Sequence, residues 1–180
     1  MRFSGIMIAL FGFTTVGCGA PAPSESVPET TQAPQTSQSA RVEGDLGQVM
    51  RGILFPNSNI IFDAQGTDPV EKAKTTVALY GNAYGGWLEV ENAAISLAEA
   101  ANLLIIPGRL CMNGKPAPMD QADWPGFVQG LRDAAQESYK AALTKNQDEI
   151  VNAAGTLTEA CAACHDKYRE KPDLADRCTP

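Results

Sequence analysis

Apolar residues recur at helical spacing in four stretches of the chain, and no apolar run bounded by turns alternates with the period of two that a strand needs. The four stretches are 45–64, 68–106, 123–145 and 146–171. Short connections join the first stretch to the second and the third to the fourth. We therefore expect the two helices of each pair to be antiparallel neighbours. The pattern predicts an all-α fold, an antiparallel four-helix bundle in up-down-up-down order.

Polar residues and prolines mark where these helices begin or change. Asp68 is placed to cap the second helix, and Pro69 suits its first turn. Asn146 opens the fourth helix, with Glu149 at the spacing of a capping box. Pro56 lies inside the first helix, where it is expected to kink or break the helix because proline lacks the amide hydrogen and clashes with the preceding turn.

Three glycines in the second helix should each cost roughly 1 kcal/mol relative to alanine. Two explanations stay open: a close helix crossing beside an aromatic core, or space for a flat ligand. The glycines are Gly81, Gly85 and Gly86. An aromatic stripe follows the same turns, at Tyr80, Tyr84 and Trp87.

The chain opens with an apolar run from about Gly5 to Val16, too short for the roughly 20 residues that span a bilayer. The run is typical of an export signal. Cys18 follows Thr-Val-Gly, which is similar to the lipobox of bacterial lipoproteins, although Thr15 stands where leucine is usual. We expect a signal peptide over 1–18 that ends at a lipidated Cys18, with ordinary signal cleavage nearby as the alternative.

Residues 19–43 are rich in Pro, Ser, Thr, Gln and Ala and hold almost no large apolar side chain. Such a segment cannot bury enough surface to offset the entropy of ordering it, so it is predicted to be a disordered tether. Residues 44–180 then form one domain. A lipid on the tether would hold this domain at the periplasmic side of a bacterial membrane; without the lipid the domain is soluble in the periplasm.

The fourth helix carries the only histidine of the chain directly after a pair of cysteines, in the sequence CAACH. Residues i, i+3 and i+4 share one face of a helix, so Cys161 and Cys164 can reach the two vinyl groups of one haem while His165 points at its iron. This spacing is typical of the attachment of haem c, here one per chain. Zinc is a weaker explanation, because a zinc site needs about four ligands and the motif supplies three. A thioredoxin-like pair would begin a helix in a βαβ unit, and a plain disulfide leaves the histidine without a role.

These features resemble the class II c-type cytochromes, the cytochrome c-prime type, in which a four-helix bundle carries a single haem on its last helix. The resemblance covers the chain from about Asp45 onward and is most specific in CAACHDKYR, where Tyr168 and Arg169 match an aromatic and a basic position. It implies that the two cysteines of CAACH bind haem covalently and that its histidine is the proximal iron ligand. The tether, Pro56 and the cysteine-bearing tail depart from the family pattern.

No methionine follows His165, so a later sixth ligand of that type is excluded. In the family, low-spin members use a methionine of the first helix, and high-spin members place an apolar side chain there. Met50 matches this position, and the neighbouring Gly52 is expected to ease close approach; Met112 and Met119 lie in the loop after the second helix. Met50 can equally be an adaptable core residue. A Met/His pair suits electron transfer, whereas an apolar distal side favours binding of nitric oxide or carbon monoxide.

Cys111 and Cys178 remain, and in an oxidising compartment they are expected to form a disulfide. It would close a loop of about 67 residues, worth roughly 4 kcal/mol in the chain-entropy model. Lys167, Arg169 and Lys171 form a basic group after the haem motif. This group is either a solvated helix end or a contact for an acidic redox partner or for the haem propionates.

The sequence therefore predicts a membrane-tethered monohaem carrier that exchanges electrons with redox partner proteins. The alternatives are a five-coordinate protein of the same fold that binds nitric oxide or carbon monoxide, and a helical interaction module without haem. A net charge of −7 without a basic patch argues against a nucleic-acid partner. No enzymatic activity is expected, because the single histidine is assigned to iron and no constellation of a nucleophile with its base is visible. The oligomeric state stays open, a homodimer included.

Overall fold

The computed structural model describes residues 40–75 and 84–180, which lie in one compact unit, Ser39–Pro180. Within this part the secondary structure is helical and no strand forms, so the predicted all-α class is confirmed. None of the helices described is long and apolar enough to cross a bilayer. The predictions that lie outside the described residues are the signal peptide 1–18 with Cys18, most of the tether 19–43, Tyr80 and Gly81.

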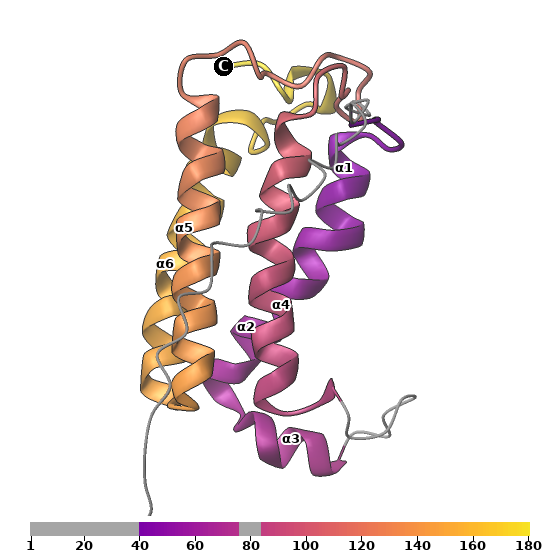
Figure 1. The fold of residues 1–180 in the computed structure, drawn as a ribbon. Helices are drawn as coiled ribbons and strands as arrows, with labels where there is room; N and C mark the ends of the chain where they lie inside the picture. Colours follow the sequence, from indigo (N-terminus) through magenta and orange to yellow (C-terminus); the bar gives the residue numbers. More distant parts are fainter. Residues whose placement is uncertain (1–39, 76–83) are drawn as a thin grey trace, which may run out of the picture. The chain divides into compact units, whose positions relative to one another are not determined.

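Successive long helices run in opposite directions (Figure 1), with α4 packed against α2 and α5, and α6 packed against α2 and α5. Alanines line the buried faces of α4, α5 and α6 and let these helices approach closely. The helical elements are α1 Leu46–Val49, a π-helical segment Met50–Leu54, α2 Phe55–Gly66, α3 Pro69–Thr75, α4 Trp87–Ala100, a 3-10 segment Ala101–Ile105, α5 Trp124–Thr144, α6 Gln147–Tyr168, and a 3-10 turn Leu174–Asp176.

Of the kink or break predicted at Pro56, the break does not occur, because the first helix passes this residue; the helix is instead distorted into a π-helical segment just before it. The five residues before Phe55 widen into a π-helical segment, in which the N–H of Phe55 donates to the carbonyl of Met50. The side-chain amide of Asn57 donates to the carbonyl of Ile53 at 2.7 Å. The helix thus continues through the proline with a wider turn before it, and prolines and π-bulges are both recognised sites of helix distortion.

The second predicted helix is not continuous, so the expectation of one helix over 68–106 is wrong. α3 begins as predicted, because Asp68 accepts from the N–H groups of Val70 at 2.7 Å and Glu71 at 3.3 Å. A new helix, α4, begins after Gly86, whose φ of 71° and ψ of −144° do not belong to a helix. The chain tightens into 3-10 geometry after Ala100.

Gly85 and Gly86 therefore precede α4 instead of interrupting a helix. A Cβ at Gly85 would lie 3.3 Å from the Cβ of Ala73 in α3, so close approach explains this glycine. Tyr84 is 65% exposed while Trp87 is 7% exposed, so the two do not share one aromatic face. Neither Gly85 nor Gly86 lines the apolar cavity beside α6 that is described below, so these two glycines do not make room for a flat ligand there.

α5 and α6 begin and end within three residues of their predicted bounds. The side chain of Asn146 caps α6 by accepting from the N–H groups of Asp148 at 2.9 Å and Glu149 at 3.4 Å. α5 ends at Thr144, and the capping residue Lys145 adopts the left-handed conformation with φ of 55°. The short turn between α5 and α6 makes them neighbours, and α6 carries CAACH toward the end of the structure where the tail folds back (Figure 1).

Candidate functional site

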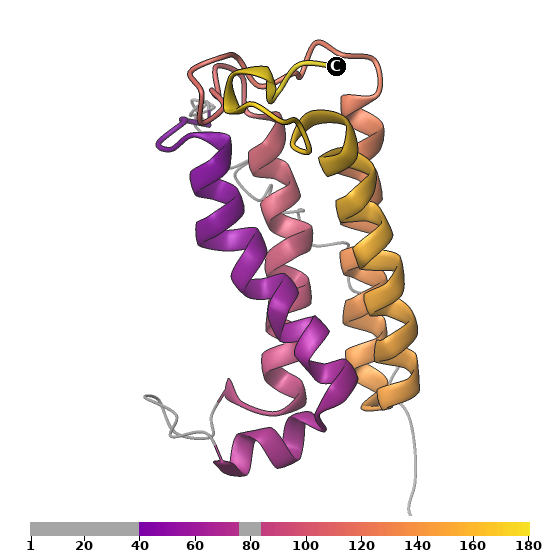
Figure 2. The same cartoon turned by 180° about the vertical axis from the view of Figure 1, so that it is seen from behind.

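A cavity of about 650 Å³ lies beside the C-terminal half of α6. Seen from behind, the first helix crosses toward the start of α6 and stands away from its end (Figure 2), and residues of both line the cavity. The volume is in the range of cofactor sites in proteins. Most of the lining is apolar and comes from several helices, including Leu54, Phe62, Leu97, Leu104, Phe127 and Val128.

The three side chains of CAACH that were predicted to bind haem all line this cavity. Cys161, Cys164 and His165 are half-buried, and the two cysteines carry free thiols. Burial raises the pKa of the Cys161 thiol and raises the pKa of Cys164 to about 11. Both thiols are therefore protonated at neutral pH. The helix presents them on one face at i and i+3, as the sequence pattern requires.

The imidazole of His165 is held in its neutral form. Burial lowers its pKa most, and the nearby positive charge of Arg169 lowers it further. Nη1 of Arg169 lies 3.2 Å from Nδ1 of His165. Arg169 also lies 3.5 Å from the carboxylate of Glu170. A neutral imidazole is the form that binds a metal ion.

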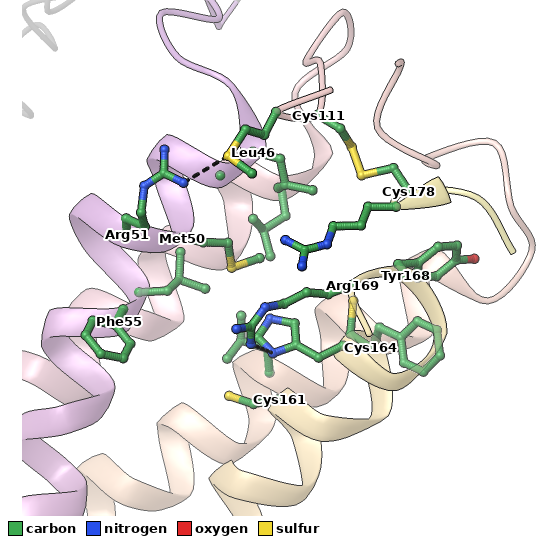
Figure 3. Close-up of a pocket in the computed structure, with 18 of the residues that line it drawn as sticks. Leu46, Met50, Arg51, Phe55, Cys111, Cys161, Cys164, Tyr168, Arg169 and Cys178 are labelled. Atoms are coloured by element: carbon green, nitrogen blue, oxygen red, sulfur yellow. Dashed lines mark hydrogen bonds between the residues drawn. A yellow bond between two sulfur atoms is a disulfide. The ribbon is translucent and has the colours of Figure 1, made fainter. Parts of the chain in front are cut away.

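Met50 lies across the cavity from Cys161 and Cys164 (Figure 3), on the π-helical segment of the first helix. The π-helical segment and its neighbours also bring Arg51 and Leu54 to the cavity.

The other two methionines of the domain differ from Met50. Met112 also lines the cavity, but its sulfur accepts from Nη1 of Arg51 at 3.1 Å, and Met119 does not line this cavity. Gly52 is exposed and a Cβ there would meet nothing within 4 Å, so the expectation that Gly52 eases the approach of Met50 to a ligand is wrong.

The predicted disulfide between Cys111 and Cys178 is present, with the Cα atoms 6.5 Å apart. Both cysteines line the cavity, so the bridge ties the loop after α4 to the tail after α6 at the cavity wall (Figure 3). Sequence reasoning anticipated the bridge and missed its neighbours on the same wall, Asn113 and Arg177. Neither belongs to a motif, and only the fold of the loop and the tail brings them to the cavity.

The end of α6 is anchored to the start of α5 by a second feature that the sequence did not reveal. The Tyr168 hydroxyl donates to the carboxylate of Asp123 at 2.6 Å, and Lys167 pairs with the same carboxylate. The buried Tyr168 ring meets Trp124 edge-on, with centroids 5.5 Å apart. Lys167 is thus committed to an intramolecular ion pair, so the basic group predicted with Arg169 and Lys171 does not present three free cations.

The model of the Cytochrome C' family matches residues 119–169. This range contains all of α5 and α6 and ends one residue after Tyr168, so it includes the CAACH motif and leaves the tail outside. The match and the helical fold support a cytochrome c-prime-like class of c-type cytochrome. No curated protein and no solved structure matches the chain.

The residues of the cavity fit the haem that this class implies. Two thiols and a neutral imidazole share one wall, apolar side chains supply most of the remaining lining, and Nε of Arg177 is buried without a hydrogen-bond partner in the part of the chain described. An apolar macrocycle with carboxylates at its edge would satisfy all three features. No group of three or more His, Cys, Asp or Glu side chains among the described residues could hold a metal ion by itself.

Proposed function

We propose that the chain is a monohaem c-type cytochrome that transfers electrons in the periplasm, with His165 and Met50 as axial ligands. One observation carries the proposal: a single apolar cavity brings Cys161, Cys164 and His165 together on α6 and places Met50 on the opposite wall. The family match over residues 119–169 supports the haem, and the position of Met50 supports the sixth ligand.

The surroundings of each residue in the site suit the role in haem binding that we propose for it. The two protonated thiols are the groups that would form the thioether links, and the neutral imidazole of His165 would hold the iron from the proximal side. Haem supplies one-electron redox chemistry when bound, and a Met/His ligand pair raises its potential. The apolar walls would keep water from the metal, which also shapes the potential.

The arrangement of the domain forms part of the same proposal. The helix contacts and directions support an antiparallel four-helix bundle with the haem on its last helix. The proposal includes a signal peptide, lipidation of Cys18 and a flexible tether that hold the domain at the periplasmic face of a bacterial membrane. The domain would act as a carrier between redox partner proteins and not as an enzyme.

The haem content of the matured protein tests the proposal. The full chain, exported in a bacterium with a cytochrome c maturation system, should stain for haem on a denaturing gel and gain the mass of one haem. Cys161→Ser and Cys164→Ser should each lose one thioether link, whereas the control variant Ala163→Ser should retain both. A wild-type polypeptide of unmodified mass would overturn the proposal and favour a helical module without haem.

A second candidate, binding of nitric oxide or carbon monoxide, is favoured by the apolar neighbours of Met50. Leu46 and Leu54 line the same wall and would face the metal if Met50 did not bind it. The absorption spectrum of the reduced protein, with and without carbon monoxide, separates the two functions. Low-spin bands that the gas does not change support the carrier, and an immediate shift supports the gas binder.

A further inference from the structure

The C-terminal tail is fastened over the cavity by three kinds of contact. Cys178 forms the disulfide to Cys111, and its N–H donates to the carbonyl of Tyr168 at 2.8 Å. The side-chain amide of Asn113 donates to the carbonyls of Leu174 and Arg177, each at 3.0 Å. Cys178 adopts the left-handed conformation, with φ of 64°, which persists only where surrounding contacts hold it. These contacts therefore fix the backbone conformation of the tail.

The conformation of the tail places the side chain of Arg177 at the cavity. Arg177 lines the cavity, and its Nε is buried with no hydrogen-bond partner among the residues that the structure describes. A buried donor of a charged group carries a large desolvation penalty unless an acceptor meets it. Because the neighbouring residues are held by the contacts above, the guanidinium is positioned for an acceptor that the described chain does not supply.

The charge of the cavity lining indicates what kind of acceptor this is. Arg51, Arg169 and Arg177 line the cavity, and among the described residues no Asp or Glu does, although the whole chain carries a net charge of −7. Arg51 donates to the sulfur of Met112, and Arg169 contacts His165 and Glu170. The third arginine is Arg177, whose buried Nε has no hydrogen-bond partner among the described residues. An arginine fork matches the geometry of a carboxylate, so the expected acceptor is an anion of this type.

We infer that Arg177 binds a carboxylate of the haem, and that the disulfide and Asn113 hold the arginine in place for this contact. The inference rests on the proposed function, since it needs haem in the cavity. It concerns residues outside the family match, which ends at 169. The tail would thus add a haem contact to the α6 attachment site, and the Cys111–Cys178 bridge would position that contact.

Resonance Raman spectroscopy of the matured full chain tests the contact directly, because the propionate bending modes respond to hydrogen bonds at the carboxylate. Arg177→Gln should shift these modes and lower the midpoint potential, since loss of a nearby cation disfavours the reduced haem. Arg177→Lys should also shift the modes but retain most of the potential, because lysine keeps the charge without the fork. The matched control is Arg132→Gln on α5, whose guanidinium bonds to Gln129 and Asn102, and it should change neither measurement.

Asn113→Ala tests whether the tail contacts hold Arg177 in place. It should shift the modes in the direction of Arg177→Gln by a smaller amount, with Cys111 and Cys178 still paired. If Arg177→Gln fails to mature, Arg177→Lys carries the same test through its Raman modes. Unchanged modes and potential in haem-bearing Arg177→Gln would overturn the inference alone, whereas wild-type protein without covalent haem would overturn the proposed function.

Discussion

The Tyr168 hydroxyl donates to the carboxylate of Asp123 at 2.6 Å and so joins the last turn of α6 to the residue before α5. Lys167 pairs with the same carboxylate, and the Tyr168 ring packs edge-on against Trp124 and Phe127, at centroid distances of 5.5 and 6.1 Å. Tyr168 lies three residues after His165 and four after Cys164. The contact therefore holds the end of α6 that carries CAACH against α5.

Tyr168→Phe should lower the free energy of unfolding by about 1 kcal/mol, because one hydrogen bond is lost while the ring still fills its site. Tyr168→Ala should cost about 3–5 kcal/mol, since it also empties a buried aromatic position. Denaturant unfolding of the matured protein measures both. The control is Tyr139→Phe on α5, which should have little effect; an equal loss in Tyr139→Phe and Tyr168→Phe would contradict the importance of the contact.

Asp123 should make stability depend on acid pH. The hydrogen bond from Lys167, and then the one from Tyr168, lowers the pKa of Asp123 below its ordinary value of 3.8. A carboxyl whose folded pKa is lowered stabilises the fold above its unfolded pKa, and the contribution is lost as the pH falls through the folded pKa. The stability difference between wild type and Asp123→Asn should thus shrink below about pH 4.

Urea unfolding between pH 7 and pH 2 measures this difference. The control is Asp133→Asn, which removes an exposed carboxylate that accepts from the neutral side chain of Gln129. The stability difference between wild type and this control should change less with pH. A wild-type advantage over Asp123→Asn that stays constant down to pH 2 would contradict the prediction.

Met50→Leu should convert a low-spin haem into a high-spin haem that binds carbon monoxide, because leucine retains the volume and removes the sulfur ligand. The midpoint potential should fall as well. Absorption spectra of the ferric and reduced protein provide the measurement. Met112→Leu and Met119→Leu are matched controls, since the Met112 sulfur is engaged by Arg51 and Met119 lies off the cavity. A wild-type spectrum in Met50→Leu would exclude this methionine as the ligand.

Loss of the disulfide should destabilise the fold by up to about 4 kcal/mol, the chain-entropy value for a loop of 67 residues. The Cys111→Ser, Cys178→Ser double variant should unfold at lower denaturant concentration than wild type. A reductant should produce the same decrease in wild type and no further decrease in the double variant. If wild type and double variant respond equally to the reductant, the bridge is not the source of the stability.

Two glycines should respond to alanine in opposite directions. Gly86 combines φ of 71° with ψ of −144°, a conformation almost restricted to glycine, so Gly86→Ala should cost about 1–3 kcal/mol. Gly155 lies within α6, and a Cβ there would meet nothing within 4 Å. Gly155→Ala should therefore stabilise the fold by about 0.5–1 kcal/mol. Thermal unfolding of the two variants measures the contrast, and equal effects would contradict the backbone argument.

The sequence predicted α5 and α6 well because their apolar periodicity is unbroken and their ends carry strong local signals, such as Asn146. The predicted continuity of the second helix was wrong because a glycine such as Gly86 is compatible with a helix by sequence. Only its backbone angles show that the helix is interrupted there. Pro56 misled in the opposite way. A local rule predicts a kink or a break there, but the helix continues through Pro56 after a π-helical segment, Met50–Leu54.

For the site, the sequence predicted that Cys161, Cys164 and His165 share one face of a helix, because their spacing depends only on helical geometry. The pairing of Cys111 with Cys178 also followed from the sequence, by elimination among few cysteines. The family resemblance suggested Met50, and the tertiary structure decided which residues line the cavity with that motif. Met50 and Arg177 reach the cavity from segments more than a hundred residues apart, and such contacts depend on how helices and the tail pack, which no local pattern encodes.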